Sequence, residues 1–300
     1  PQLHRGGRAR RGLAGVVAEY ISDLLARGRT FSFEFFPPKT DAEEERLEAA
    51  LHHLEPLAPS FVSVTYRGGR SSRDRTTKLV SNMERDTALN PMAHLICVAH
   101  TRAELIDILG DFKAAGLKNV LALGGDPPTD ADAIEGELKY GEEMVDLVRE
   151  VGGFAVGVAA HPEVHPRSPS RAEDRDRLAA KLDKADFAIT QFFFRVDDYA
   201  GMMDDLRARG VDKPVLPGIM PISSLKSIKR MAELSGAEVP SEVVARIQAV
   251  SDDDDAVKAE GIAIATELCQ DLLAYGVPGI HFITMNTSTA TSEIYKNLGL

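Results

Sequence analysis

Residues 31–39 read FSFEFFPPK, a run in which aromatic residues alternate with small or polar ones until two prolines end it. The alternation is typical of a β-strand, and the prolines stop the strand because they lack the backbone N–H group that strand pairing needs. Glu34 lies in the middle of this run, with aromatic residues on both sides. A carboxylate in such a strand needs an explanation, because an unpaired buried charge costs free energy.

Seven similar runs follow, and the eight together span residues 31–36, 61–66, 92–98, 119–125, 155–161, 187–194, 214–220 and 279–286. Between them lie amphipathic stretches such as TRAELIDILGDFKAAG, with apolar residues three and four positions apart and a glycine suited to a helix C-cap. Eight alternating strands and helices in about 270 residues favour a closed α/β fold, a (β/α)8 TIM barrel, over an open doubly wound sheet. We expect a short helical N-terminal extension over residues 1–28 and a single catalytic barrel over residues 29–300.

The composition narrows the class of function. A formal net charge of −11 argues against a nucleic-acid-binding surface, and no apolar run approaches the roughly 20 residues that a membrane span needs. Cys97 and Cys269 lie far apart in apolar segments, which favours neither a disulfide framework nor a zinc site. The acidic run over residues 251–255 is better explained as a helix cap than as a cation site. We expect a cytoplasmic homo-oligomer that binds small molecules, without a membrane, nucleic-acid or metal partner.

Barrel geometry suggests where the polar residues gather. Alternate residues of each strand face the surrounding helices and the others point inward, which places Phe33 and Phe35 outside and Ser32 and Glu34 inside. Glu34 then lies near the carboxyl end of its strand, where barrel enzymes build their active sites. Other polar residues occupy comparable places on the later strands: Ser63, Thr65, His94, Asp126, His161, His165, Gln191 and Asn286. Each alone is explained as well by a cap or a turn, but together they predict one site at one mouth of the barrel.

Six segments carry a resemblance to a known family. FSFEFFPPKT, FVSVTY, LALGGDPP, HPEVHP, AITQFFF and GIHFITMN resemble, in order, the strand-end motifs of the methylenetetrahydrofolate reductase family, across residues 29–300. The resemblance implies a bacterial-type enzyme with a single catalytic barrel, in which NADH or NADPH passes a hydride to FAD. The reduced flavin then converts methylenetetrahydrofolate to methyltetrahydrofolate.

The resemblance also implies the catalytic residues. Glu34 matches the family's general acid, which protonates the folate so that its methylene carbon can accept hydride. Its aromatic neighbours are expected to raise the pKa of the carboxyl group, because burial disfavours the charged form. The structural alternative is an ion pair with Lys39 or Arg67. Asp126 matches an aspartate that stabilises the cationic folate, although GGDPP by itself is as well explained as a turn.

The remaining matches concern ligand binding. Gln191 matches a glutamine that contacts both folate and nicotinamide; the structural alternative is a core amide bonded to strand backbone. The positions that match the family's cofactor contacts are Thr65, His94, Gly125, Asp126, Tyr140, Gly141, His161, His165, Asp174 and Lys181. Those that match its substrate contacts are Glu34, Asp126, Gln191, Leu225 and Met285.

Three positions depart from the family's pattern. Gly124 stands where the family usually has an arginine, His161 where it usually has a tyrosine, and Leu225 where a phenylalanine often stacks on folate. The lost arginine implies looser FAD, a substitute such as Arg67 or Arg70, or direct hydride transfer from the nicotinamide without flavin. A further alternative is a non-redox barrel that binds a pterin or transfers a methyl group.

Overall fold

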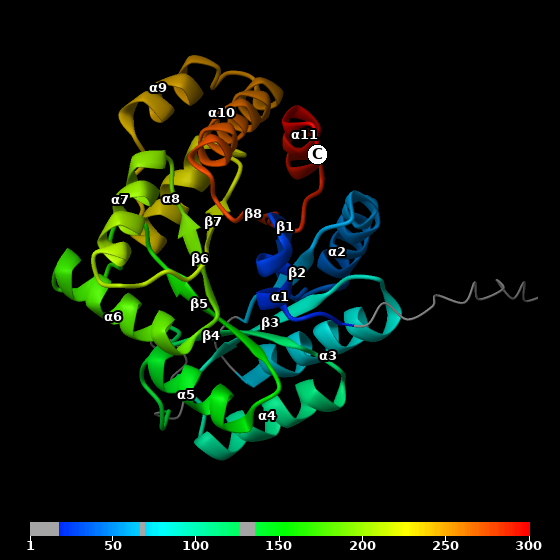
Figure 1. Ribbon diagram of the computed structural model, residues 1–300. Helices are drawn as coiled ribbons and strands as arrows, with labels where there is room; N and C mark the ends of the chain where they lie inside the picture. Colours follow the sequence, from blue (N-terminus) through cyan, green and yellow to red (C-terminus); the bar gives the residue numbers. More distant parts are fainter. Residues whose placement is uncertain (1–17, 67–69, 127–135) are drawn as a thin grey trace, which may run out of the picture.

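The computed structural model describes residues 18–66, 70–126 and 136–300. In these residues eight parallel strands form a closed barrel, in which each strand pairs with the next along the chain and β1 pairs with β8 (Figure 1). The strands are β1 (Thr30–Phe35), β2 (Phe61–Val64), β3 (Pro91–Ile96), β4 (Asn119–Leu123), β5 (Ala155–Ala160), β6 (Phe187–Phe192), β7 (Val215–Ile219) and β8 (Gly279–Ile283). The predicted (β/α)8 barrel is confirmed.

The helices surround this barrel. They are α1 (Ile21–Arg27), α2 (Asp41–Leu54), α3 (Arg70–Asp86), α4 (Arg102–Ala114), α5 (Gly141–Val151), α6 (Arg171–Lys184), α7 (Val196–Arg207), α8 (Leu225–Ser235), α9 (Ser241–Ala249), α10 (Asp254–Tyr275) and α11 (Thr289–Leu298), with a 3-10 turn, η1, at Glu55–Leu57. Thr101 and Glu104 form a capping box at the start of α4. The side chain of Asp253 accepts the first free N–H groups of α10, which confirms the cap interpretation of the acidic run.

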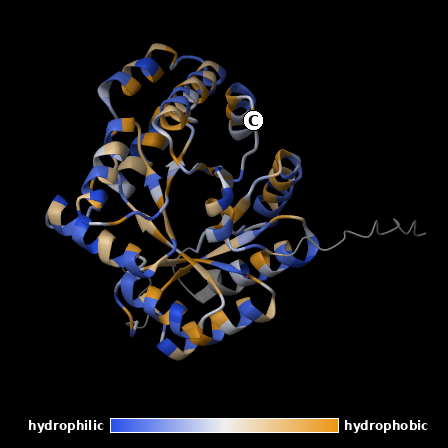
Figure 2. Ribbon diagram, viewed as in Figure 1, coloured by the Kyte–Doolittle hydropathy of each residue, from blue (hydrophilic) through white to orange (hydrophobic). Residues whose placement is uncertain are grey.

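Two apolar layers follow from the strand alternation, and Figure 2 shows hydrophobic residues concentrated on the strands with hydrophilic ones on the outer helix faces. Phe33 and Phe35 belong to the layer between strands and helices, where the Phe33 ring lies 5.3 Å from that of Tyr295 in α11. Phe61 and Phe187 belong to a second cluster inside the barrel. The predicted outward face is therefore confirmed for Phe33 and Phe35.

Helix α1 closes the amino end of the barrel. Ile21 is fully buried in the inner cluster, and its N–H donates to Asn119 Oδ1 at 2.8 Å. The side-chain amides of Asn119 and Asn90 both donate to the carbonyl oxygen of Glu19, at 2.9 and 3.1 Å. The described part of the helical extension thus shares a core with the strands, while its predicted boundary at residue 29 stays a prediction. No helix in the described ranges is long and apolar enough to cross a membrane.

Candidate active site

Glu34 lies on the inner face of β1, and its side chain is 13% exposed, so the carboxylate is nearly enclosed but still reaches solvent. One of its oxygens, Oε2, lies 3.4 Å from His281 Nε2 and 3.5 Å from His94 Nε2. The partners of this carboxylate are therefore imidazoles on β8 and β3. The structural alternative was an ion pair of Glu34 with Lys39 or Arg67. The two histidines stand in the place of Lys39, and Arg67 lies outside the described residues.

A hydrogen-bonded network fixes His281 below the carboxylate. Its Nδ1 lies 2.7 Å from Ser32 Oγ, and its Nε2 lies 3.2 Å from Ser63 Oγ. All three side chains are buried. The contacts are satisfied when the Ser32 hydroxyl donates to Nδ1 and the proton on Nε2 faces Glu34 and Ser63. The ring can then stabilise a negative charge on Glu34.

This environment corrects the predicted acidity of Glu34. Burial does raise the pKa of the carboxyl group, but the hydrogen bond from His281 and the charge interactions with both histidines lower it, and the net pKa is below its usual value. The prediction of a raised pKa was wrong for the ligand-free protein. Phe33 and Phe35 point to the helix layer, so the carboxylate meets polar groups from strands that are far away in the sequence instead of these aromatic rings.

The segment after β8 holds the end of β1. Thr284 Oγ1 donates to the carbonyl oxygen of Glu34 at 2.7 Å. The Asn286 side chain pairs with the backbone of Phe36, accepting from its N–H at 2.8 Å and donating to its carbonyl oxygen at 2.9 Å. Met285 and Asn286 adopt left-handed φ angles of 55° and 56°, and Met285 is 41% exposed. The predicted contact of Met285 with substrate stays a prediction.

Two buried polar atoms, one just after β2 and one on β3, lack a hydrogen bond within the described ranges, although the second, His94 Nε2, lies 3.5 Å from the Glu34 carboxylate. Val64 pairs with Ala93, so Thr65 continues β2 beside His94 on β3. Among the described residues, neither Thr65 Oγ1 nor His94 Nε2 has a hydrogen-bond partner, although both are buried. Buried polar atoms are normally satisfied, so these two mark a place where a ligand would supply the missing contacts.

The loop after β4 brings backbone close to backbone. A Cβ atom on Gly124 would lie 3.3 Å from the backbone nitrogen of Gly141, and a Cβ atom on Gly125 would lie 2.6 Å from a Val98 methyl group. Gly125 also has a φ of +91°, which favours glycine. This packing explains why two glycines occur together here.

Asp126 ends the described part of this loop, and its side chain is 98% exposed. Its Oδ1 lies 3.7 Å from Arg167 Nη2, which also donates to the carbonyl oxygen of Gly125 at 3.1 Å. Arg167 thus places a guanidinium against the loop in which Gly124 stands where the family usually has an arginine. The suggested substitute Arg67 lies outside the described residues, as does the side chain of Arg70. The catalytic role of Asp126 stays a prediction.

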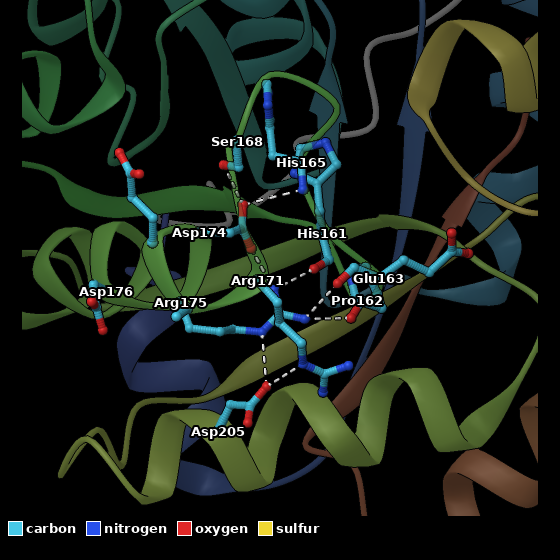
Figure 3. Close-up of polar contacts among 12 residues, drawn as sticks. His161, Pro162, Glu163, His165, Ser168, Arg171, Asp174, Arg175, Asp176 and Asp205 are labelled. Carbon is cyan, nitrogen blue, oxygen red and sulfur yellow. Dashed lines mark hydrogen bonds and ion pairs between the residues drawn. The ribbon is translucent and has the colours of Figure 1, made fainter.

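The segment after β5 carries the two predicted histidines (Figure 3). The rings of His161 and His165 meet edge to face, with their centroids 4.5 Å apart. Burial lowers the pKa of both imidazoles, and nearby cations lower it further. Asp174 Oδ1 accepts from the His165 N–H at 3.1 Å and from Ser168 Oγ at 3.0 Å. The carboxylate of Asp174 therefore orders this segment, and its predicted contact with a cofactor stays a prediction.

The other predicted residues lie at different depths around the mouth. Lys181 Nζ donates to the carbonyl oxygen of Ala159 at 2.9 Å, and burial lowers its pKa to about 8. Gln191 Oε1 accepts from the Phe192 N–H at 2.9 Å, so its oxygen is bonded to strand backbone as in the structural alternative. Gln191 and His161 line the same small pocket.

Leu225 and Tyr140 are among the predicted ligand contacts that do not line this pocket. Leu225 is partly buried against the apolar cluster around Met220 and Ile222. Tyr140 is 59% exposed and lies under the guanidinium of Arg177, 5.8 Å from its ring centroid. Their roles in binding substrate and cofactor stay predictions.

Three residues at this mouth were missed by the sequence analysis. His281 is an inward residue of an apolar strand, so the alternation that identified His94 also carried the signal for it. Arg167 and Arg175 are charged residues in a polar stretch, where nothing distinguishes a loop contact from an exposed surface. Their contacts appear only when the segment after β5 folds back over α6.

The enclosed imidazole of His94 predicts acid sensitivity. Burial lowers its pKa to about 4, against about 6.5 in an unfolded chain. As the pH falls between these values, the unfolded state binds a proton that the folded state does not, so the free energy of unfolding falls by about 1.4 kcal/mol per pH unit. We expect His94→Asn to flatten the dependence of the unfolding temperature on pH. His53→Asn on the surface of α2 is the control, and equal slopes in wild type and His94→Asn would contradict the prediction.

The donor set fits a flavin nucleotide. Thr65 Oγ1 and His94 Nε2, which are two of the four buried side-chain atoms without a hydrogen bond in the described residues, offer hydrogen bonds to a polar ligand. The loop at Gly125 exposes backbone to close approach, and Lys181 and Arg167 supply the positive charge that phosphate groups need. These residues would hold the cofactor along the ends of β2 to β5.

Comparisons with known proteins agree on one family. Residues 20–299 match the sequence model of the family described as methylenetetrahydrofolate reductase. The chain is 36% identical over 286 residues to the 5,10-methylenetetrahydrofolate reductase of Pectobacterium carotovorum subsp. carotovorum. This match covers 94% of this chain and 95% of that protein. It is also 36% identical to the Escherichia coli (strain K12) protein of the same name, over 90% of each chain. Methylenetetrahydrofolate reductase (NADH) 1 of Arabidopsis thaliana is 35% identical, and the match covers 95% of this chain and 51% of the plant protein.

Solved structures support the fold. A Clostridium thermocellum protein, described as binding two copies of 5-methyl-5,6,7,8-tetrahydrofolic acid, superposes with a TM-score of 0.63 at 14% identity, over 93% of this chain and 98% of that one. A tryptophan synthase α-subunit from Pyrococcus furiosus superposes with a TM-score of 0.53 at 12% identity, over 91% and 99%. At these identities the likeness concerns the barrel alone.

Proposed function

Because the chain belongs to the methylenetetrahydrofolate reductase family, we propose that it reduces 5,10-methylenetetrahydrofolate to 5-methyltetrahydrofolate with a hydride from NADH or NADPH that passes through FAD. The observation that carries this proposal is the enclosed carboxylate of Glu34, at the carboxyl end of β1 with imidazoles at 3.4 and 3.5 Å. The overall reaction consumes one hydride and one proton. FAD, when bound, would accept the hydride from the nicotinamide and deliver it to the folate.

Glu34 supplies the proton in this proposal. A folate ring nitrogen must be protonated before the ring opens to the iminium ion that accepts hydride. The carboxyl group has a lowered pKa in the ligand-free protein because two histidines stabilise its charge against the effect of burial. A bound folate that covers the exposed part of this side chain would strengthen the burial effect, which raises the pKa. Glu34 would then hold a proton only when the folate is present to receive it.

A second candidate function keeps the reduction but transfers the hydride directly from the nicotinamide. The observation in its favour is the contact between Gly124 and Gly141, where a Cβ atom would come within 3.3 Å of backbone. This packing leaves the loop without the arginine that the family resemblance implies beside the flavin. His161 in place of a tyrosine points the same way.

The absorption spectrum and the stoichiometry of the purified protein separate these functions. We expect the visible band of bound flavin, or its appearance with a gain of activity when FAD is added, and one NADH oxidised for each methylenetetrahydrofolate reduced. A protein that gains nothing from FAD but still oxidises NADH with this folate would support direct transfer. A protein that binds the folate and oxidises no nicotinamide nucleotide would support the non-redox barrel.

Arg167 gives a second test of the cofactor. Its guanidinium lies against the loop at Gly125, and a hydrogen bond from this charged group to a bound phosphate would be worth about 1.5–3 kcal/mol, or roughly tenfold or more in affinity. We expect Arg167→Gln to weaken FAD binding by about tenfold, measured from flavin fluorescence. Arg171→Gln is the matched control because Arg171 pairs with Asp205 instead (Figure 3). Equal FAD affinity in both variants would remove Arg167 from the cofactor site.

An arginine restored at position 124 is a less clean test. The backbone of Gly141 would have to move before a side chain fits at Gly124. A gain in FAD affinity from Gly124→Arg would therefore be offset by a loss of stability. The Arg167→Gln variant tests whether a positive charge beside this loop binds FAD, and it does not require the backbone of Gly141 to move.

A further inference from the structure

The largest fully buried side chain in the described residues is an arginine, Arg175, on α6. Charged groups are rarely enclosed unless hydrogen bonds and opposite charges replace the water that they lose. The contacts of Arg175 meet this condition, and three of its five partners lie in the segment after β5 (Figure 3).

The guanidinium binds three consecutive carbonyl groups. Its Nη1 donates to the oxygen of His161 at 3.0 Å. Its Nη2 donates to the oxygens of Pro162 and Glu163 at 2.6 and 2.8 Å. Strand β5 ends at Ala160, so these carbonyl groups have left the barrel sheet and need other donors. Arg175 supplies donors to all three from a single rigid group.

Two carboxylates balance the charge of Arg175. Asp174 Oδ2 lies 2.5 Å from Nη1, and Asp205 Oδ2 on α7 lies 3.3 Å from Nε. The other oxygen of Asp174 accepts from the His165 N–H and from Ser168. Arg175 therefore holds the start of the segment through its carbonyl groups, and the adjacent Asp174 holds its end through the backbone N–H of His165.

We propose that Arg175 is a positioning residue of the reductase, which fixes residues 161–165 so that His161 and His165 keep their places at the mouth of the barrel. The inference rests on the proposed function and on the family match that places His161 and His165 among the cofactor contacts. Arg175 itself is buried and touches neither substrate nor cofactor. Its effect reaches the site through the backbone of this segment. The same segment also contacts the linker after α8, because the Glu163 carboxylate accepts from the backbone N–H of Glu238 at 2.9 Å.

Removal of the guanidinium would leave several groups unpaired together. Three carbonyl oxygens, one in a buried and two in part-buried hydrogen bonds, would lose their donors, and Asp174 would lose the counter-charge of Arg175. The segment would then relax toward water and carry both histidines with it. An ammonium group at the same position restores the charge but not the planar set of donors, so a lysine is expected to recover only part of the effect.

The test compares Arg175→Met and Arg175→Lys with a matched control, Arg149→Met. Arg149 also binds backbone carbonyl groups, of Lys184 and Phe154, and pairs with Asp186, but it lies before β5 instead of after it. The measurements are hydrogen–deuterium exchange of residues 161–170 in the ligand-free protein, the dissociation constant of FAD, and kcat and KM for NADH.

We expect faster exchange in residues 161–170 of Arg175→Met, with the FAD dissociation constant and the KM for NADH raised by about tenfold to a hundredfold and kcat at saturation changed far less. Arg175→Lys should fall between this variant and wild type. Arg149→Met should lower the unfolding temperature without these changes. Should Arg175→Met not fold, Arg175→Lys carries the same test with smaller changes.

Unchanged ligand constants in a folded Arg175 variant, or exchange that rises evenly along the whole chain, would overturn the inference and leave Arg175 a residue of general stability. A failure of the proposed function looks different. Wild-type protein would then oxidise no NADH with methylenetetrahydrofolate, while the exchange measurement would still report whether Arg175 holds the segment.

Discussion

Glu34→Gln is expected to lower the rate at which methylenetetrahydrofolate reoxidises the reduced flavin by about a hundredfold to ten-thousandfold, the contribution typical of a positioned general acid. Flavin reduction by NADH should change little, because that half-reaction needs no proton from Glu34. The amide has nearly the shape of the carboxyl group and can still accept from His281, so the surrounding structure should be kept. Both half-reactions are followed by stopped-flow absorbance at the flavin band.

Glu43→Gln provides the control for a lost carboxylate at a distance from the reaction. Glu43 lies in the first turn of α2, where it accepts from the backbone N–H of Lys39 at 2.7 Å. Its replacement should alter neither half-reaction. Equal losses in both half-reactions of Glu34→Gln would show that Glu34 positions the ligands or supports the structure, and does not act as the acid.

Asp126→Asn is expected to slow folate reduction by roughly tenfold to a thousandfold, while FAD stays bound. A negative charge near the folate favours the cationic iminium ion, and the loss of one such preorganised contact typically costs this much. The exposed position of Asp126 makes a loss of stability small, because its described ion-pair partner, Arg167, lies 3.7 Å away on the surface. Stopped-flow reoxidation and the thermal unfolding temperature measure the two effects separately.

Arg167→Gln distinguishes two roles for Asp126. If Asp126 serves only to pair with Arg167, both variants should lose the same function by similar factors. If its charge acts on the folate, Arg167→Gln should weaken FAD binding and, once saturated with FAD, reoxidise at nearly the wild-type rate. An Asp126→Asn protein that releases FAD and unfolds at lower temperature would instead assign Asp126 to the turn.

The barrel could be predicted because its signals are local. Each strand and helix carries its own periodicity, and eight such pairs leave few ways to close a parallel sheet. The alternation in residues 31–36 even assigned Phe33 to the helix layer and Glu34 to the interior. Capping in the acidic run was predictable for the same reason, since Asp253 binds N–H groups only two and three residues away.

The chemistry around Glu34 was less predictable, because it depends on contacts between distant residues. His281 reaches the carboxylate from 247 positions along the chain, and this contact reverses the expected direction of the pKa shift. Strand alternation says which way a residue points but not which side chain from another strand it meets. Arg175 was missed for a related reason: within RAEDRDRLAAKLDK it is one of several charges, and only the return of the segment after β5 encloses it.

The docking of α1 has a consequence for the order in which the barrel assembles. Ile21 and Glu19 are made well before their partners, Asn90 just before the third strand and Asn119 at the start of the fourth, and β1 itself must wait for β8 before the ring closes. Such long separations slow folding and leave apolar surface exposed while the chain is incomplete. Helix α1 is therefore expected to be among the later elements to settle, although it is made before these strands, and its burial reports that the barrel beneath it has formed.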